Sequence, residues 1–450
     1  MSDERPPRAL GGAPARERPA VPPGPYLVVG LRVAGAAAAR MLRAHGEVMG
    51  CDRGAPAEAT GLEGVEVELE SEGVDLVERA RTVVKSPGVP ASAPAIAAAR
   101  ARGLEVIGEL ELAWRLLANE FVAVTGTNGK TTTSELLGAI YREAGEPVVV
   151  AGNAGTPLAA LVTENVDPAA VVVCESSSFQ LEDSSAFAPE CALLLNVAED
   201  HLDRHGSFEA YRAAKLRVFA NQRPDDVAVT PLGLDLPGAA RAVTFGAAAA
   251  TLAHRDDDLW WRGERLMPAA DVRLRGAHNL ENAMAAAAAA LARGVREPGV
   301  TGALATFAGV RHRLEEVAER DGVTFVNDSK ATNVASASVG VEAYAGGVHL
   351  ILGGSPKGGG FAGLREPVAE RCRACYLIGA AAEAIAADLA GAVPVERCGD
   401  LERATTAAAR AARPGDVVLL SPACASFDQY PNFEARGDHF RALAIRLARA

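Results

Sequence analysis

The sequence predicts an α/β protein of three domains, each built around a mainly parallel sheet. Apolar strand-like runs such as YLVVG, AVVVCE and CALLLN alternate with alanine-rich helical stretches from end to end. The runs lack interleaved polar residues, as expected for parallel strands that are buried on both faces. A chain of 450 residues also exceeds the roughly 250–300 residues that a single core usually holds.

Changes in composition set the expected domain boundaries. Residues 1–24 are rich in Pro, Arg, Ala and Gly and contain no apolar run, which indicates a disordered tail. Three α/β domains should follow, over residues 25–108, 109–309 and 310–450. Within the second domain, residues 227–275 change to short, turn-rich segments around DDDLWWRGER, which suggest a small β excursion.

Composition also narrows the class of function. A net charge of −12 disfavours nucleic-acid partners, because non-specific binding of that kind depends on Lys and Arg. The run AMAAAAAALA is shorter than the about 20 apolar residues that cross a bilayer, so no membrane partner is expected. Seven scattered cysteines favour the cytoplasm, and Cys372 and Cys375 are better explained as small buried side chains than as a zinc or redox pair. We expect a monomer.

The first domain opens with a turn that resembles a dinucleotide-binding turn. GLRVAG follows a strand-like run, and Asp52 lies about 20 residues further on, where a ribose-binding acid is expected. However, Arg32 replaces the middle glycine, and its side chain should obstruct a pyrophosphate, so hydride transfer with NAD is disfavoured. A nucleotide held through Arg32 and a turn without a ligand both remain open. The segment KSPGVP forms a Pro-Gly turn that should line the rim of the same cleft.

The central domain contains a strong anion-binding motif, TGTNGKTT. Backbone N–H groups, a helix N-terminus and the charge of Lys130 together favour a phosphate, and Thr131 can offer its hydroxyl to Mg²⁺. Only two residues separate Gly126 from Gly129, whereas the common phosphate loop has four residues between its glycines. The motif therefore predicts nucleotide binding by a shortened loop.

Other polar residues of this domain are ambiguous one by one. Glu175 ends the run AVVVC, where an acid is either a helix cap or a metal ligand. The segment EDHLDRHG, which includes His201, is typical of a charged surface loop, and Lys215 in YRAAKLRVF is typical of a solvated helix.

Taken together, however, TGTNGKTT, ESSSFQLE, NVAEDHLDRHGS and YRAAKLRVF resemble the Mur ligase family, the ATP-dependent amino-acid ligases of peptidoglycan synthesis. The later segments VNDSKATN, LGGSPKGGGF and LSPACASFDQYPNFEARGDHF are similar to the members that add D-glutamate to UDP-N-acetylmuramoyl-L-alanine. The resemblance runs from about Tyr26 to the C-terminus. It implies transfer of the ATP γ-phosphate to a carboxylate, followed by attack of the D-glutamate amine on the acyl phosphate.

The resemblance also implies roles for individual residues. In the family the phosphate loop binds ATP, which points to Gly126, Thr127, Asn128, Gly129, Lys130, Thr131, Thr132 and Thr133, with Asn153, Asn279, Asn282, Arg313 and Asp328 elsewhere in the pocket. Thr131 and Glu175 would hold one Mg²⁺, and His201 and Lys215 a second. Because an ammonium cannot bind a cation, the family carbamylates this lysine with CO₂, and a partly buried amine is implied.

Substrate residues follow in the same way. Asp52 and Arg53 match uridine-nucleotide contacts, although Arg32 and Ala34 depart from the family's Gly-x-Gly-x-(Thr/Ser)-Gly turn. The residues that match the D-glutamate pocket are Lys330, Thr332, Lys357, Ser426 and Phe433, the last of which would equally suit core packing. An ATP site divided between two domains implies closure on binding. The open alternatives are a ligase for another amino acid, including a folylpolyglutamate-type ligase, a phosphate-loop GTPase or kinase, and a non-catalytic nucleotide-binding protein.

Overall fold

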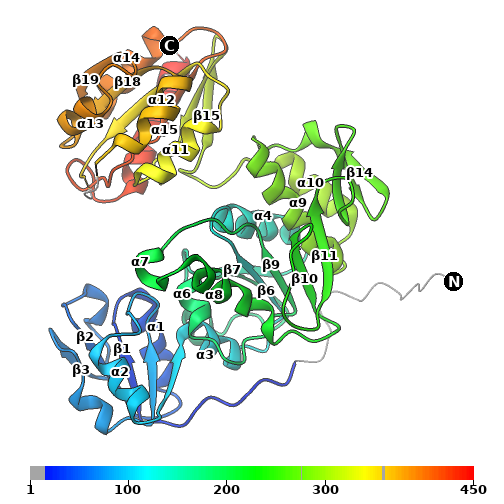
Figure 1. Cartoon of the computed structure of the whole chain (residues 1–450), viewed down its shortest axis with the longest axis vertical. Helices are drawn as coiled ribbons and strands as arrows, with labels where there is room; N and C mark the ends of the chain where they lie inside the picture. The colour runs from blue at the N-terminus through cyan, green and yellow to red at the C-terminus, as the bar shows by residue number, and fades with distance from the viewer. Residues whose placement is uncertain (1–15, 275, 357–359, 450) are drawn as a thin grey trace. The chain divides into compact units, whose positions relative to one another are not determined.

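The computed structural model of the chain describes residues 16–274, 276–356 and 360–449. Two compact units divide these residues: the first runs to Arg273 and includes His278–Phe307, and the second comprises Leu274–Ala277 and the chain from Ala308 onward. Three sheets, all mainly parallel, lie within the two units, which confirms the predicted α/β class (Figure 1). No helix among the described residues is both long and apolar enough to cross a membrane.

The N-terminal sheet is entirely parallel, with the order β3-β2-β1-β4-β5. Its strands are β1 (Tyr26–Val29), β2 (Val48–Asp52), β3 (Glu66–Leu69), β4 (Thr82–Lys85) and β5 (Glu105–Gly108). The accompanying helices are α1 (Val33–Leu42), α2 (Pro94–Ala101) and α3 (Glu109–Leu116). Because β1 is paired with β2 on one side and β4 on the other, the strand order reverses there, and such a switch point is where ligands bind in open α/β sheets.

The central sheet has the order β14-β13-β12-β11-β10-β9-β6-β8-β7. Its strands are β6 (Phe121–Thr125), β7 (Val148–Gly152), β8 (Val171–Glu175), β9 (Cys191–Leu194), β10 (Val227–Pro231), β11 (Arg241–Gly246), β12 (Leu252–Arg255), β13 (Asp258–Trp261) and β14 (Glu264–Pro268). The last three strands pair antiparallel, which confirms the β excursion predicted for this segment. Asp256 and Asp257 turn the first hairpin with φ of 51° and 62°, the left-handed geometry that tight hairpin turns require.

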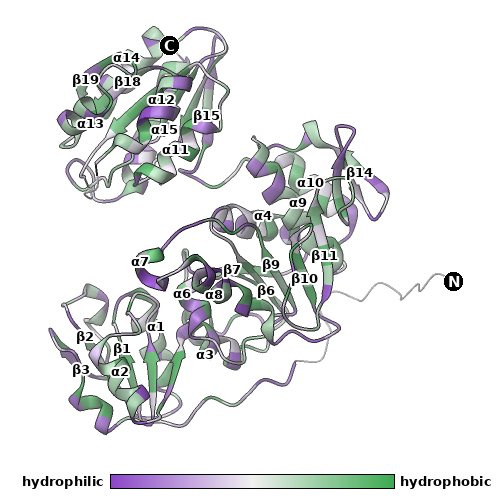
Figure 2. Cartoon of the chain, in the orientation of Figure 1, coloured by the Kyte–Doolittle hydropathy of each residue, from purple (hydrophilic) through white to green (hydrophobic). Residues whose placement is uncertain are grey.

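Helices and a continuous apolar core complete the first unit. The helices are α4 (Lys130–Glu143), α5 (Leu158–Thr163), α6 (Ser178–Glu182), α7 (Leu202–His205), α8 (Phe208–Ala220), α9 (Ala277–Ala292) and α10 (Glu297–Thr306). One cluster of buried side chains extends from Leu42 of α1 through Trp114 of α3 to Phe187 and Val218, so the N-terminal and central sheets share a core. Strand β10, which is buried from Val227 to Thr230, carries mainly the hydrophobic colour in Figure 2.

The second unit contains a six-stranded sheet with the order β15-β16-β20-β17-β18-β19, parallel except for the β15–β16 pair. Its strands are β15 (Glu315–Arg320), β16 (Val323–Asn327), β17 (Val348–Gly353), β18 (Cys372–Ile378), β19 (Val395–Gly399) and β20 (Val417–Leu420). The helices are α11 (Val334–Glu342), α12 (Arg365–Arg371), α13 (Ala382–Asp388), α14 (Leu401–Ala411) and α15 (Phe433–Arg449). Separate apolar clusters cover the two faces of the sheet.

The disordered tail expected for residues 1–24 does not extend through residues 16–24, which lie against the first unit. The Arg18 guanidinium donates to the carbonyls of Trp114 and Asn119, both at 2.5 Å, and lies 5.0 Å from the Trp114 ring. Arg16 donates to Asp226 at 2.7 Å. Composition alone suggested disorder, but two arginines and Val21 find buried partners that only the folded chain brings together.

We expect Arg18→Ala to lower the thermal unfolding temperature of the first unit. The substitution removes two hydrogen bonds and a buried cation–π contact, together worth about 1–3 kcal/mol. Differential scanning calorimetry of the full chain would measure the shift. Glu17→Ala, one residue away on an exposed side chain, is the matched control and should leave the unfolding temperature unchanged.

Candidate active site

The phosphate loop joins β6 to α4, at the edge where β6 lies between β9 and β8. Gly129 caps α4 with φ of 83°, and a Cβ there would lie 2.2 Å from Oδ1 of Asn282. Only glycine suits this position, because the backbone is left-handed and because α9 approaches too closely to leave room for a side chain. The helix starts at Lys130, so its first N–H groups lie beside the loop, as an anion-binding helix N-terminus requires.

Two lysines meet at one carbonyl of this loop. The ammonium of Lys130 donates to the carbonyls of Gly126 and Thr127 at 2.9 Å, and Lys215 donates to the same Gly126 carbonyl at 2.7 Å. Burial, and then the charge of Lys130, lower the pKa of Lys215 to about 7, with Asp200 opposing the shift. The Lys215 amine is therefore partly neutral near neutral pH, the form that reacts with CO₂.

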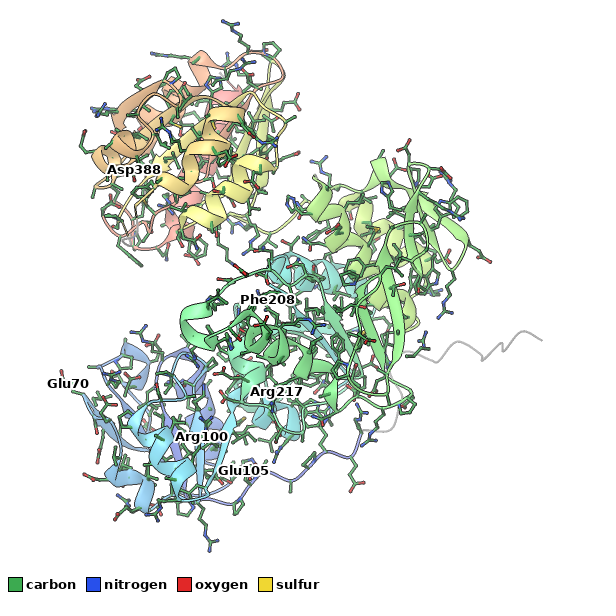
Figure 3. The ribbon with its side chains drawn as sticks, in the orientation of Figure 1. Glu70, Arg100, Glu105, Phe208, Arg217 and Asp388 are labelled. Carbon is green, nitrogen blue, oxygen red and sulfur yellow. The ribbon has the colours of Figure 1, made fainter. Side chains whose placement is uncertain are left out.

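Helix α8 holds Lys215 between Phe208 and Arg217, which are labelled in Figure 3. One turn earlier, Tyr211 places its ring 4.5 Å from the Lys215 nitrogen and its hydroxyl 3.1 Å from Oγ1 of Thr127. The Thr127 hydroxyl also accepts from the Ala198 N–H at 3.0 Å. Thr127 therefore anchors the loop within the protein, and Tyr211 is a residue that the sequence analysis missed.

Asn196 is a second missed residue. Its side chain accepts from the Asn128 N–H at 2.9 Å and donates to the Asn128 carbonyl at 3.2 Å, while its own carbonyl accepts from Thr127. A signal was present, because Asn196 follows the strand-like run CALLL at the same sheet edge as the phosphate loop. These hydrogen bonds hold the shortened phosphate loop against the segment that follows β9.

Glu175 lies at the end of β8, with 3% of its surface exposed. Its Oε1 accepts from the side chain of Asn153 at 2.8 Å, and its carbonyl accepts from the Asn153 N–H at 2.8 Å. Asn153, which the resemblance assigns to the nucleotide pocket, here orients the Glu175 carboxylate. A buried acid held by one oxygen can offer its other oxygen to a cation.

His201 has a left-handed backbone with φ of 51° at the start of α7, and its side chain is 47% exposed. Its Nε2 lies 3.5 Å from Asp200, and its ring centroid lies 4.9 Å from that of Phe179. Among the described residues, no group of three or more His, Cys, Asp or Glu side chains could hold a metal.

The nucleotide residues predicted in α9 lie beside the phosphate loop. Asn282 is buried, donates to the Asn279 side chain at 3.3 Å and covers Gly129. In the second unit, both carboxylate oxygens of Asp328 accept hydrogen bonds, from the Leu314 N–H at 3.2 Å and from Ser421 at 2.7 Å. Burial raises the pKa of Asp328 to about 7, and the charge of Arg313 opposes that shift.

The loops predicted to bind D-glutamate are connected by Arg436, which the sequence analysis did not single out. This guanidinium is 1% exposed and donates to the Ser329 hydroxyl and carbonyl and to the carbonyls of Cys424 and Ala425, at 2.9–3.2 Å. It thereby links the loop that carries Lys330 and Thr332 with the loop that carries Ser426. Phe433 begins α15 and stacks edge-on to His312 with centroids 6.3 Å apart. Lys357 lies outside the described residues.

In the first domain, Asp52 supports the opening turn. Its carboxylate accepts from the N–H groups of Leu31 at 2.7 Å and Gly54 at 2.9 Å, while Arg53 pairs with Glu72 at 3.0 Å. Arg32 is exposed and has an extended backbone, φ −71° and ψ −172°, which any residue can adopt. The turn itself therefore does not require the missing middle glycine.

Comparisons with known proteins identify the family of each domain. Residues 25–108 match the N-terminal domain of MurD-like Mur ligases, residues 124–290 the Mur ligase middle domain, and residues 312–424 the Mur ligase glutamate ligase domain. This chain belongs to the Mur ligase family. A relative from Acidobacterium capsulatum, named UDP-N-acetylmuramoylalanine--D-glutamate ligase, is 44% identical over 93% of this chain and 95% of its own length.

A second relative of the same name, from Anaeromyxobacter dehalogenans, is 45% identical over 94% of this Mur ligase and 97% of its own length. Solved structures share the fold at lower identity. The UDP-N-acetylmuramate-alanine ligase MurC of Thermotoga maritima has a TM-score of 0.57 at 18% identity, with 94% of this chain and 99% of that chain covered. The MurF ligase of the same organism, in complex with ADP, also scores 0.57 at 17% identity, over 95% and 96% of the two chains.

We expect Gly129→Ala to weaken ATP binding at least about tenfold. The added methyl group would lie 2.2 Å from Oδ1 of Asn282 and would displace Asn282 or the loop, and a loss of about 1.4 kcal/mol already corresponds to tenfold in affinity. Isothermal titration with ATP would measure the change. Gly145→Ala is the matched control, because Gly145 has φ of 78° but nothing within 4 Å of its Cβ position. Unchanged ATP affinity in Gly129→Ala would contradict this assignment of the loop.

Proposed function

We propose that this Mur ligase joins D-glutamate to UDP-N-acetylmuramoyl-L-alanine, with conversion of ATP to ADP and phosphate, in the synthesis of peptidoglycan precursors. The observation that carries the proposal is the full-length similarity to relatives of 39–45% identity that share the name UDP-N-acetylmuramoylalanine--D-glutamate ligase. The chain is thus an ATP-dependent enzyme that forms an amide bond.

The central physical problem of this reaction is repulsion between two anions. The substrate carboxylate must approach a triphosphate, and two unit charges about 4 Å apart repel by roughly 4 kcal/mol at an effective dielectric of 20. The N-terminus of α4 and the Lys130 ammonium supply positive potential where the phosphates would lie.

Residues on two sides of the phosphate loop would hold magnesium. Thr131 and Glu175 would hold one cation, and His201 with carbamylated Lys215 would hold a second. Such ions would neutralise the developing charge on the transferred phosphoryl group. The lowered pKa of Lys215 supports carbamylation, because its neutral amine is the nucleophile toward CO₂.

Chemistry then proceeds in two steps. A carboxylate oxygen of the muramoyl-alanine substrate forms a bond to the γ-phosphorus as the bond from that phosphorus to ADP breaks. The D-glutamate amine attacks the acyl carbon, loses a proton, and phosphate leaves from the tetrahedral intermediate. Lys330, Thr332, Lys357, Ser426 and Phe433 are the proposed D-glutamate residues, with Arg313 and Asp328 as the proposed nucleotide contacts from the same unit.

The remaining proposals concern the UDP-linked substrate, the cell compartment and the oligomeric state. Asp52 and Arg53 would contact the uridine nucleotide at the switch point of the N-terminal sheet, consistent with the place where open sheets bind ligands. All seven cysteines are free thiols, which suits the reducing cytoplasm that we propose as the site of reaction. We propose that the enzyme acts as a monomer, which sedimentation analysis would test.

The proposed reaction predicts release of phosphate only when ATP, Mg²⁺, the muramoyl-alanine nucleotide and D-glutamate are all present. A malachite-green assay would measure it, and replacement of D-glutamate by each of the twenty L-amino acids is the comparison that tests specificity. Release that depended on another amino acid would identify a different ligase of the family. Release without any amino acid would indicate a hydrolase.

Lys215→Arg should abolish turnover, because arginine keeps the charge but cannot form the carbamate ligand. In ¹³C NMR with labelled CO₂, the wild-type chain should show a carbamate signal that Lys215→Arg lacks. At constant dissolved CO₂ the signal should grow between about pH 6 and about pH 8, since the neutral fraction of an amine with a pKa of about 7 rises across that range. Full activity of Lys215→Arg would refute the ligand role.

A further inference from the structure

One lysine of the chain has no part in the proposed reaction. Lys and Arg together number 45, and only five are lysines: Lys85, Lys130, Lys215, Lys330 and Lys357. Four of the five belong to the proposed ATP and D-glutamate sites. The fifth, Lys85, ends β4 in the first domain and begins the segment KSPGVP.

Lys85 is completely buried and reaches from the first domain into the central domain. Its ammonium lies 2.6 Å from Oδ2 of Asp183 and 3.4 Å from Oε1 of Glu182, and it donates to the Val89 carbonyl at 2.9 Å. Glu182 ends α6, the short helix that follows the strand carrying Glu175, and Asp183 comes next in the chain. A buried charge of this kind is tolerated only with close partners, so the contact is geometrically demanding.

A second cation, Arg204, contacts two of the same acceptors, the Val89 carbonyl and Glu182. Arg204 lies in α7, three residues after His201, and donates to the carbonyls of Pro87 at 3.3 Å and Val89 at 2.9 Å. It also pairs with Glu182 at 2.8 Å, and its guanidinium lies 4.7 Å from the Phe179 ring. The segment that carries both His201 and Arg204, called here the His201 loop, is thus hydrogen-bonded to the same Val89 carbonyl as Lys85.

The loop held by these cations forms one wall of the opening turn of the first domain. The Ser86 hydroxyl donates to the Gly30 carbonyl at 2.6 Å, and the Ser86 N–H donates to the Val29 carbonyl at 3.1 Å. A Cβ at Gly30 would lie 2.7 Å from Cγ2 of Val89. Any shift of the Ser86–Val89 segment therefore moves the turn at which the uridine nucleotide is proposed to bind.

We propose that Lys85 and Arg204 are positioning residues that set the distance between the nucleotide-binding turn and the His201 loop. The inference rests on the proposed function, because that reaction requires the far end of a long UDP-linked substrate to meet the transferred phosphate. The apolar core shared by the two domains is non-directional, whereas two cations that share the Val89 carbonyl and Glu182 fix a register. A displacement of about 1 Å in such an arrangement can cost about a hundredfold in rate.

The test removes each cation without leaving a buried charge alone. The variant Lys85→Met with Asp183→Asn deletes the ion pair, and Arg204→Met deletes the second contact. Both should raise the KM for UDP-N-acetylmuramoyl-L-alanine and lower kcat, by between about tenfold and a hundredfold in kcat/KM, while the KM for ATP stays within about twofold. Arg100→Gln is the control, because Arg100, labelled in Figure 3, is half exposed, lies 4.0 Å from Asp183 and should change neither constant.

A variant that combines the two deletions distinguishes a positioning role of the two cations from a general loss of protein stability. Since both cations act on one loop, their effects on kcat/KM should be clearly less than additive. Hydrogen exchange of the ligand-free full chain should rise in residues 86–90 for each variant. Additive effects, an equal rise in the KM for ATP, or unchanged kinetics with an active wild-type enzyme would overturn the inference. If the wild-type chain releases no phosphate, the proposed function fails, and the exchange measurement alone then decides whether the cations hold this loop.

Discussion

Positive charge buried against the Gly126 carbonyl is the feature on which the candidate site depends. Lys130 and Lys215 come from different helices, and both donate to this one oxygen at 2.7–2.9 Å. Their mutual repulsion is tolerated because burial and proximity hold the pKa of Lys215 near 7, so one of the two amines can remain neutral. Burial beside Lys130 therefore prepares the Lys215 amine for modification and leaves the Lys130 ammonium to bind an anion.

Cations anchored on backbone carbonyls recur at several loops of this chain. Arg436 holds the Ser329 and Ala425 segments together, and Arg18 holds the chain at Trp114 and Asn119. A carbonyl partner keeps the positive charge of the cation, whereas a carboxylate would neutralise it. Arg436 therefore fixes the relative positions of the two loops that carry the proposed D-glutamate residues Lys330, Thr332 and Ser426.

The loops of the site are all placed at carboxyl ends of parallel strands. The phosphate loop follows β6, Glu175 ends β8 and Asn196 follows β9, so neighbouring strands deliver the phosphate-binding, acidic and loop-closing groups to one edge. Covalent continuity alone would not bring His201 or Lys215 to that edge. The contact of Tyr211 with Thr127 joins α8 to the phosphate loop, and the contact of Arg204 with Val89 joins α7 to the first domain.

The sequence by itself determined the α/β class, the phosphate loop, the β excursion and the family, because strand periodicity and contiguous motifs are local properties that survive without a structure. It also singled out Lys130, Glu175, His201 and Lys215, each within a recognisable segment. Only the tertiary structure decided that Asn153 orients Glu175, that Asp52 supports its own turn and that residues 16–24 are packed. The roles of Tyr211, Arg436, Lys85 and Arg204 were missed because they arise from partners that are distant in the chain and that only the fold brings together. Asn196 differs, because its place directly after a strand-like run could have been noticed in the sequence.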